Sequence, residues 1–173
     1  MPLRHQPVAL VLSRQALPTI DRTGHASAAG VARGAYVLAD APDGHPDVLL
    51  LATGSEVALC LEARAELGRE GIHAHVVSMP SWELFEPQPP EYRQAVVPPA
   101  VQARVAVEQA SAFGWERYVG SDGTIVGMHT LGASAPLKAL QQKFGFTPER
   151  LVEAARAQVA RWNTASSDRG RRT

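Results

Sequence analysis

The chain has 173 residues, which suits one domain of ordinary size with a single buried core. Its 17 basic and 17 acidic residues cancel, so no overall charge attracts it to nucleic acid or to an anionic membrane. Its single cysteine, Cys60, excludes a disulfide within this sequence and indicates a reducing compartment, so we expect a cytoplasmic protein that binds neither nucleic acid nor membrane.

The first predicted element is a strand from Val8 to Leu12, an unbroken apolar run after Pro7. Such a run is typical of a strand that is buried on both faces. Arg14 follows this strand at its carboxyl end, where open α/β sheets place ligand groups. A guanidinium there can hold a phosphate through two parallel hydrogen bonds. The alternative is a surface arginine that pairs with a carboxylate.

The middle of the chain predicts a compact α/β unit that begins near Gly34, after a linker over residues 16–33. The turn Asp40 to Pro46 is too short for a crossover helix, so the first two strands should be antiparallel. The remaining spacings suit crossover connections, which imply a mostly parallel sheet with helices on both sides. We place five strands, at residues 34–39, 47–52, 74–78, 103–107 and 124–128.

The clearest helix is predicted from Ser55, an N-cap candidate, to Gly71. Its sheet-facing stripe should consist of Val57, Leu61 and Ala65. Cys60 lies among apolar neighbours on this helix, which favours a small buried hydrophobe over a reactive thiol. The alternative for Gly54-Ser55-Glu56, an anion site made of backbone N–H groups, is opposed by the charge of Glu56 in the first turn.

The last helix is predicted to begin at Thr147-Pro148-Glu149, where Thr147 caps the helix and Pro148 takes the first helical position. Its apolar face should run from Leu151 to Trp162. The polar residues 163–173 then read as a disordered tail.

Other candidate sites are weaker. His73 and His75 are two residues apart on a predicted strand, as a metal pair would be, but no third ligand has suitable spacing, so ordinary strand packing is favoured. No basic residues interleave with the aromatic residues, which favours core and domain contacts over a stacking platform. These aromatic residues are Trp82, Phe85, Trp115, Tyr118 and Phe144.

A series of motifs from Leu12 to Phe146 resembles, in order and spacing, the C-terminal end of transketolases. The motifs are Ser13-Arg14-Gln15, Ala52-Thr53-Gly54-Ser55-Glu56-Val57, Val77-Ser78-Met79-Pro80-Ser81-Trp82-Glu83-Leu84-Phe85, Ala103-Arg104-Val105-Ala106-Val107-Glu108, Gly114-Trp115-Glu116-Arg117-Tyr118-Val119-Gly120, Leu131-Gly132-Ala133-Ser134-Ala135-Pro136 and Phe144-Gly145-Phe146-Thr147.

The resemblance implies a three-layer α/β/α domain with a mixed, mostly parallel five-stranded sheet whose first strand runs against the rest. It also implies domain bounds. Residues 1–15 would be the last strand of a pyrimidine-binding domain, residues 16–33 a linker, and residues 34–162 the transketolase C-terminal domain. In this family the arginine that corresponds to Arg14 binds the phosphate of the sugar substrate, together with residues that lie upstream of this sequence.

Transketolases transfer a two-carbon ketol unit between sugar phosphates in the pentose phosphate pathway, with thiamine diphosphate and magnesium as cofactors. Gly120-Ser121-Asp122-Gly123 invites comparison with the start of the thiamine diphosphate motif, but Ser121 interrupts it. Asn163, the only asparagine, lies too far along the chain to complete the magnesium site. We therefore expect a turn into the fifth strand here, and no cofactor and no metal site in this chain. The resemblance also implies that this chain has no catalytic residue, because the activating Glu and the catalytic His of transketolases lie in regions before this sequence.

Two functions remain open. The first is the C-terminal portion of a transketolase, inactive alone, which would meet sugar phosphate only in a full-length context and could associate with the missing domains or as a homodimer. The second is an autonomous non-catalytic module that binds a partner subunit or a small anion.

Overall fold

The structure, a computed structural model, describes residues 7–13 and 15–170. The strands are β1 (Tyr36–Ala39), β2 (Val48–Ala52), β3 (Ala74–Ser78), β4 (Arg104–Ser111) and β5 (Thr124–Met128). The helices are α1 (Glu56–Arg69), α2 (Trp82–Phe85), α3 (Pro90–Val96), α4 (Glu116–Val119), α5 (Leu137–Phe144) and α6 (Pro148–Gly170), with short 3-10 helices at η1 (Ala28–Arg33) and η2 (Pro42–Gly44). All five predicted strands are therefore present, with bounds that differ by a few residues.

The strands form one mixed sheet in the order β1-β3-β2-β4-β5. β2 pairs in parallel with both β3 and β4, and β4 pairs in parallel with β5. β1 pairs antiparallel with β3 at the edge. The expectation of a mostly parallel five-stranded sheet whose first strand runs against the rest is confirmed.

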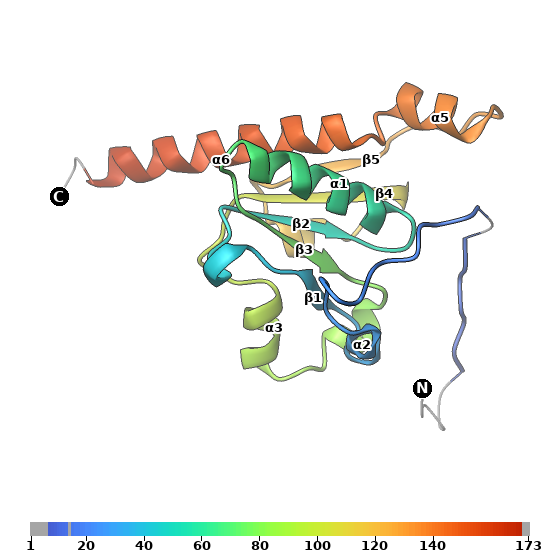
Figure 1. Cartoon of the computed structure of the whole chain (residues 1–173), viewed down its shortest axis with the longest axis horizontal. Coiled ribbons are helices and arrows are strands. Elements are labelled where there is room, and N and C mark those ends of the chain that lie inside the picture. Colours follow the sequence, from blue (N-terminus) through green and yellow to red (C-terminus); the bar gives the residue numbers. More distant parts are fainter. Residues whose placement is uncertain (1–6, 14, 171–173) are drawn as a thin grey trace.

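The core lies on both faces of this sheet. Val48, Leu50 and Ala52 of β2 belong to one buried cluster, whereas Leu49 and Leu51 belong to another, because successive side chains of a strand point to opposite faces. α1 and α6 cover the first face, and α2 and α3 lie on the other side of the sheet (Figure 1). The result is the predicted three-layer α/β/α arrangement.

The connection between β1 and β2 differs from its prediction in one respect. The two strands run in opposite directions, but they are not neighbours, because β3 lies between them. Residues 40–47 are long enough to step over one strand, since strands lie about 4.8 Å apart and an extended residue spans about 3.3 Å.

Helix α1 confirms the position of its predicted N-cap residue and corrects its predicted sheet-facing stripe. Ser55 is the N-cap residue, but its hydroxyl makes no cap bond; it donates to Oε1 of Glu56 at 3.0 Å instead. The buried face comprises Val57, Cys60, Ala63 and Leu67, together with Glu56. Ala65, which we placed toward the sheet, is exposed, because the helix is rotated so that Ala63 and Leu67 face the core. The burial of Cys60 is as predicted.

Helix α6 confirms its predicted start and extends beyond its predicted end. Oγ1 of Thr147 accepts a hydrogen bond from the backbone N–H of Arg150 at 3.3 Å, as an N-cap should. Leu151 and Ala155 are fully buried, and Trp162 packs against the same cluster. The helix continues to Gly170, although we expected a disordered tail from residue 163, because a helix can propagate into polar sequence once it has a packed first half.

The segment Val8 to Leu12 has no strand in the structure, contrary to its apolar pattern. Leu10, Val11 and Leu12 are 78%, 95% and 80% exposed. A strand requires a partner for its backbone hydrogen bonds, and the sheet order given above contains no strand from this segment. This pattern therefore predicts a pairing that the described part of the chain does not make.

Candidate functional site

Arg14, the residue predicted to contact phosphate, lies outside the described residues, so its role stays a prediction. The segment that follows it is described. Gln15, Ala16, Leu17 and Pro18 line a pocket of about 510 Å³ together with residues of α1, α5 and the start of α6. The chain next to Arg14 thus lies, largely exposed, beside α1 and α5 on the face of the sheet that α1 and α6 cover.

A glutamate with a buried side chain, Glu56, follows the C-terminal end of β2. Glu56, the first residue of α1, is 4% exposed and accepts the hydrogen bond from Ser55 described above. Burial raises the pKa of Glu56, and the nearby charge of Glu108 raises it further, whereas hydrogen bonds from its own backbone N–H, Ser55 and Gln109 act in the opposite direction. Its carboxylate thus occupies the helix N-terminus, where an anion would bind.

Glu108 lies near the end of the neighbouring strand β4, where the pairing with β5 becomes irregular between Glu108 and Ser111. Oε1 of Glu108 accepts the backbone N–H of Ala110 at 2.8 Å. A pocket of about 290 Å³ opens at this edge of the sheet, and Thr53, Trp82, Glu108, Ser111 and Trp115 are among the residues that line it. Strand pattern alone did not indicate this irregularity.

This edge is acidic and hydroxylic rather than basic. The residues that line its pocket include Glu83 and Glu108 but no lysine or arginine. Two carboxylates repel a phosphate, and no cation in the described lining offsets them. The carboxyl edge formed by β2 and β4 is therefore not suited to hold a sugar phosphate by its own side chains.

The glycine-rich segment Gly120 to Gly123 is a turn into β5, as predicted. The carbonyl oxygen of Asp122 accepts hydrogen bonds from Nε2 of Gln158 at 2.8 Å and from Nη1 of Arg161 at 3.2 Å. The carboxylate of Asp122 also forms an ion pair with Arg161. Since these groups are engaged by α6, the segment does not fit a diphosphate and its metal ion.

The two histidines that could have formed a metal pair have different surroundings. His75 is buried on β3, with Nε2 at 2.9 Å from Oδ1 of Asp40. His73 precedes the strand rather than lying on it, and its backbone N–H donates to Oδ2 of Asp47 at 2.7 Å. Among residues 7–13 and 15–170, no group of three or more His, Cys, Asp or Glu residues could hold a metal ion.

The aromatic residues make core contacts, as predicted. The ring centroid of Trp82 lies 5.4 Å from those of Trp115 and Tyr118. Phe85 lies 6.1 Å from Tyr118. Phe144 packs against the core cluster on the opposite face of the sheet.

In the described part of the chain, no helix has the length and apolar character needed to cross a membrane.

Comparison with known sequences gives a consistent result over most of the chain. A sequence model of the family described as transketolase-like TK C-terminal domain matches residues 34–147. The transketolase of Geobacillus stearothermophilus is 49% identical over 152 residues, which are 88% of this chain and 23% of that protein. The chain thus spans less than a quarter of the length of this relative.

Solved structures show the same arrangement of elements. A transketolase from Pichia stipitis, solved in complex with sedoheptulose 7-phosphate, superposes with a TM-score of 0.77 at 34% identity, over 87% of this chain and 21% of that one. A split-gene transketolase, described as an inactive β4 tetramer, superposes with a TM-score of 0.59 at 23% identity, over 75% of this chain and 43% of that one. The second likeness concerns the fold alone.

Proposed function

The chain belongs to the transketolase family, whose C-terminal domain it contains, and we propose that it works as the C-terminal portion of an enzyme that transfers a two-carbon ketol unit between sugar phosphates. The observation that supports this most directly is the 49% identity to a transketolase over 88% of the chain. The family resemblance further suggests a cytoplasmic protein of the pentose phosphate pathway.

We propose that the chain alone is inactive. Thiamine diphosphate stabilises the carbanion in this reaction and must be held in a fixed pose next to an activating carboxylate. Neither the turn at Gly120 to Gly123 nor the acidic edge at Glu108 provides such a site. The cofactor and its magnesium ion would be held by domains that correspond to the rest of the relatives' length.

Arg14 is the residue of this chain that we propose to contact substrate. The family assigns the arginine of the Ser-Arg-Gln motif to the sugar phosphate, and Ser13-Arg14-Gln15 reproduces that motif. A guanidinium offers two parallel hydrogen bonds to a phosphate. The remaining contacts to that phosphate would come from the missing domains.

The proposed division of the chain follows the same comparison. Residues 34–162 would form the C-terminal domain, and residues 1–15 would supply the last strand of the pyrimidine-binding domain. In that arrangement the exposed side chains of Leu10, Val11 and Leu12 would be buried in the sheet of that domain. Burial of three such side chains would stabilise the association by several kcal/mol, at about 1.5–3 kcal/mol each.

Partners are proposed on the same basis. Association with transketolase domains that this chain lacks would complete the active site, and a homodimer is the second arrangement to consider. The split-gene transketolase is described as an inactive tetramer of its β chain. An inactive assembly of this chain with itself is therefore a natural comparison state for the experiment below.

The test is a reconstitution assay. The purified chain should show no transfer from a ketose phosphate donor in the presence of thiamine diphosphate and magnesium, and calorimetry should detect no binding of the cofactor. Activity should appear when a separately purified polypeptide, which comprises the preceding domains of the Geobacillus relative, is added. The preceding domains alone provide the control.

Two outcomes would separate the proposals. Activity of the chain alone, or binding of the cofactor at micromolar concentration, would contradict its inactivity. Failure to restore activity despite formation of a stoichiometric complex would favour the alternative function, an autonomous module that binds a partner subunit or a small anion.

A further inference from the structure

A third pocket, of about 350 Å³, lies on the face of the sheet that carries α2, α3 and α4, and we name it the arginine pocket. Arg93, Arg104 and Arg117 line it, together with one carboxylate, Glu86. Phe85 and Tyr118 contribute aromatic surface. Three guanidinium groups against one carboxylate give the lining a formal charge of plus two.

Arg104 places a fixed positive charge beside this pocket. Its Nε donates to the carbonyl oxygen of Val101 at 2.7 Å, Nη1 to that of Tyr118 at 2.8 Å and Nη2 to that of Pro98 at 2.9 Å. All three acceptors are neutral, and no described carboxylate forms an ion pair with Arg104. Burial lowers the pKa of this guanidinium, as expected for a cation without a close opposite charge.

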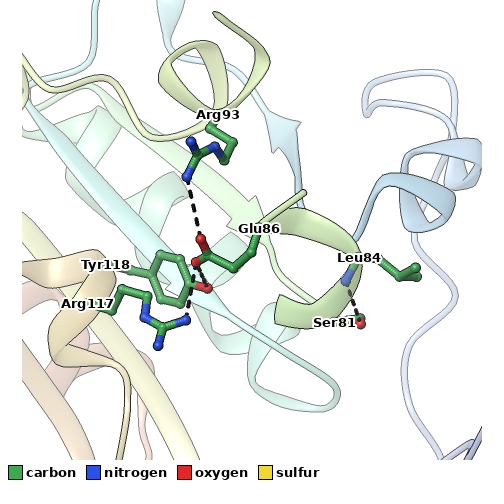
Figure 2. A network of polar contacts seen from close by, with 6 residues as sticks. All are labelled: Ser81, Leu84, Glu86, Arg93, Arg117 and Tyr118. Carbon is green, nitrogen blue, oxygen red and sulfur yellow. Dashed lines mark hydrogen bonds and ion pairs between the residues drawn. The ribbon is translucent and has the colours of Figure 1, made fainter. Parts of the chain in front are cut away.

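Arg93 and Arg117 approach Glu86 from two sides (Figure 2). Each places Nη1 at 3.4 Å from one of the carboxylate oxygens, whereas the hydroxyl of Tyr118 donates to Oε1 of Glu86 at 2.7 Å. Hydrogen bonds between a guanidinium and a carboxylate are normally about 2.7–2.9 Å. The short bond of Glu86 is therefore made with a neutral phenol, and its two cationic partners are held only loosely.

From this arrangement we propose that the arginine pocket binds a small dianion of the phosphate class, held by Arg93 and Arg117 and attracted by Arg104. The lining carries the opposite charge to such a ligand. Guanidinium groups match phosphate oxygens in pairs, and each has spare N–H donors beyond its long contact with Glu86. Glu86 is the group that opposes binding, because its negative charge competes for the same two arginines.

This site is separate from the proposed contact of Arg14 with substrate. Arg104 is the first residue of β4, whereas Glu108 lies further along that strand, toward its carboxyl end. The segment Gln15 to Pro18 lines a pocket with residues of α1, α5 and the start of α6, on the opposite face of the sheet. The proposal therefore does not depend on the proposed function, and either one can fail alone.

The experiment is a titration of the full chain with inorganic phosphate or with glycerol 3-phosphate, at an ionic strength kept constant with chloride. Calorimetry gives the affinity, and the Nε–H resonances of the arginines report which guanidinium groups are contacted. The test variants are Arg93→Gln, Arg117→Gln and Glu86→Gln. Arg150→Gln is the matched control, since Arg150 is an exposed arginine of α6 that pairs with Glu153.

We expect saturable binding of at least one of the two anions at millimolar concentration or below. Arg93→Gln and Arg117→Gln should each weaken it about tenfold, which is the effect of one lost charge-assisted hydrogen bond. Glu86→Gln should strengthen it, because glutamine can still accept from Tyr118 without competing as an anion. Binding of phosphate alone would indicate a free-phosphate site, and tighter binding of the ester would indicate a phosphorylated metabolite.

Several results would overturn the proposal. These are the absence of saturable binding of both anions to the wild type, an equal loss in Arg150→Gln, or weaker binding in a folded Glu86→Gln variant. The last of these keeps the test decisive even if Arg93→Gln or Arg117→Gln fails to fold, because Glu86→Gln is predicted to change the affinity in the opposite direction.

Discussion

Nε2 of His75 lies 2.9 Å from Oδ1 of Asp40, and this contact connects buried strand β3 to the segment that follows β1. The side chain of His75 is 7% exposed, whereas that of Asp40 is 66% exposed. Burial lowers the pKa of His75. The charge of Asp40 and a hydrogen bond from the imidazole to the backbone carbonyl of Gly44 act against this shift, and Arg64 adds to it. The neutral imidazole is therefore favoured in the folded chain.

The pH dependence of stability should follow from this. Below the usual histidine pKa of about 6.5, the unfolded chain gains a proton at His75 before the folded chain does, so the free energy of unfolding should fall as the pH is lowered. Urea unfolding at a series of pH values between about 7.5 and 5.5 measures it. His75→Gln should flatten this slope. His129→Gln, at an exposed position, is the control and should leave the slope as it is. An unchanged slope in His75→Gln would contradict the assignment of the pH dependence to His75.

Glu56→Gln should raise the free energy of unfolding at neutral pH. The pKa of Glu56 is raised in the folded chain, so its contribution to stability is present at low pH and is lost as the pH rises through that pKa. Glutamine avoids the burial of a charge and can keep the hydrogen bond from Ser55. Denaturant unfolding at pH 7 and pH 4 should show that the gain shrinks on acidification. Glu62→Gln, at an exposed position of the same helix, should show no comparable gain.

Gly34→Ala should destabilise the fold by more than about 1 kcal/mol. Gly34 has φ +86°, and a Cβ there would lie 2.3 Å from the backbone N of Phe85 and 2.4 Å from the carbonyl oxygen of Ser81. Gly68→Ala is the matched control, because this helical glycine has no atom within 4 Å of its added Cβ. It should stabilise α1 by about 0.5–1 kcal/mol. Equal thermal shifts for the two variants would refute the steric account.

Cys60 should react with a thiol reagent only when the chain unfolds. It is fully buried, and burial together with the charge of Glu56 raises its pKa well above the usual thiol range. Labelling with a coloured disulfide reagent should be slow in buffer and should follow the unfolding rate as denaturant is added. An Ala65→Cys variant supplies an exposed thiol on the same helix that should react at once. Rapid loss of both thiols in buffer would show that Cys60 is accessible.

Arg14→Ala should matter only in the reconstituted enzyme. Loss of one charge-assisted contact to the substrate phosphate should lower kcat/KM for phosphorylated acceptors by one to two decades, or about 1.5–3 kcal/mol. Non-phosphorylated acceptors should be almost unaffected. Neither the stability nor the phosphate affinity of the isolated chain should change. An equal loss with both acceptor types would make Arg14 structural.

The sequence predicted where the strands lie along the chain better than it predicted which strands lie next to each other in the sheet. Runs such as Val48 to Ala52 are apolar throughout because both faces are covered, and such a pattern is local. That β3 lies between β1 and β2 depends on pairings between distant segments, which neither the length nor the composition of residues 40–46 specifies. The prediction of which face of α1 is buried was wrong for the same reason. Ala65 and Ala63 have equal hydrophobicity, and only the surrounding core decides which of them is buried.

The polar sites were the least predictable features. The role of Arg14 is still a prediction from a motif, and the surroundings of Glu56 and Glu86 were not predicted at all. Their surroundings come from segments far apart along the chain: Glu108 for the first, and Arg117 and Tyr118 for the second. A carboxyl group acquires a raised pKa or two cationic neighbours only after folding brings such segments together.

The position of β3 between β1 and β2 also fixes an order of events during synthesis. β1 leaves the ribosome before β3, the strand that it pairs with in the described sheet, has been made, so the hydrogen bonds between these two strands must wait until residue 78 has emerged. In that interval the nascent chain exposes an unpaired strand, to which another chain can add. A delay in translation before residue 78 has emerged would prolong this exposure, whereas the same delay after its emergence would leave β1 already paired.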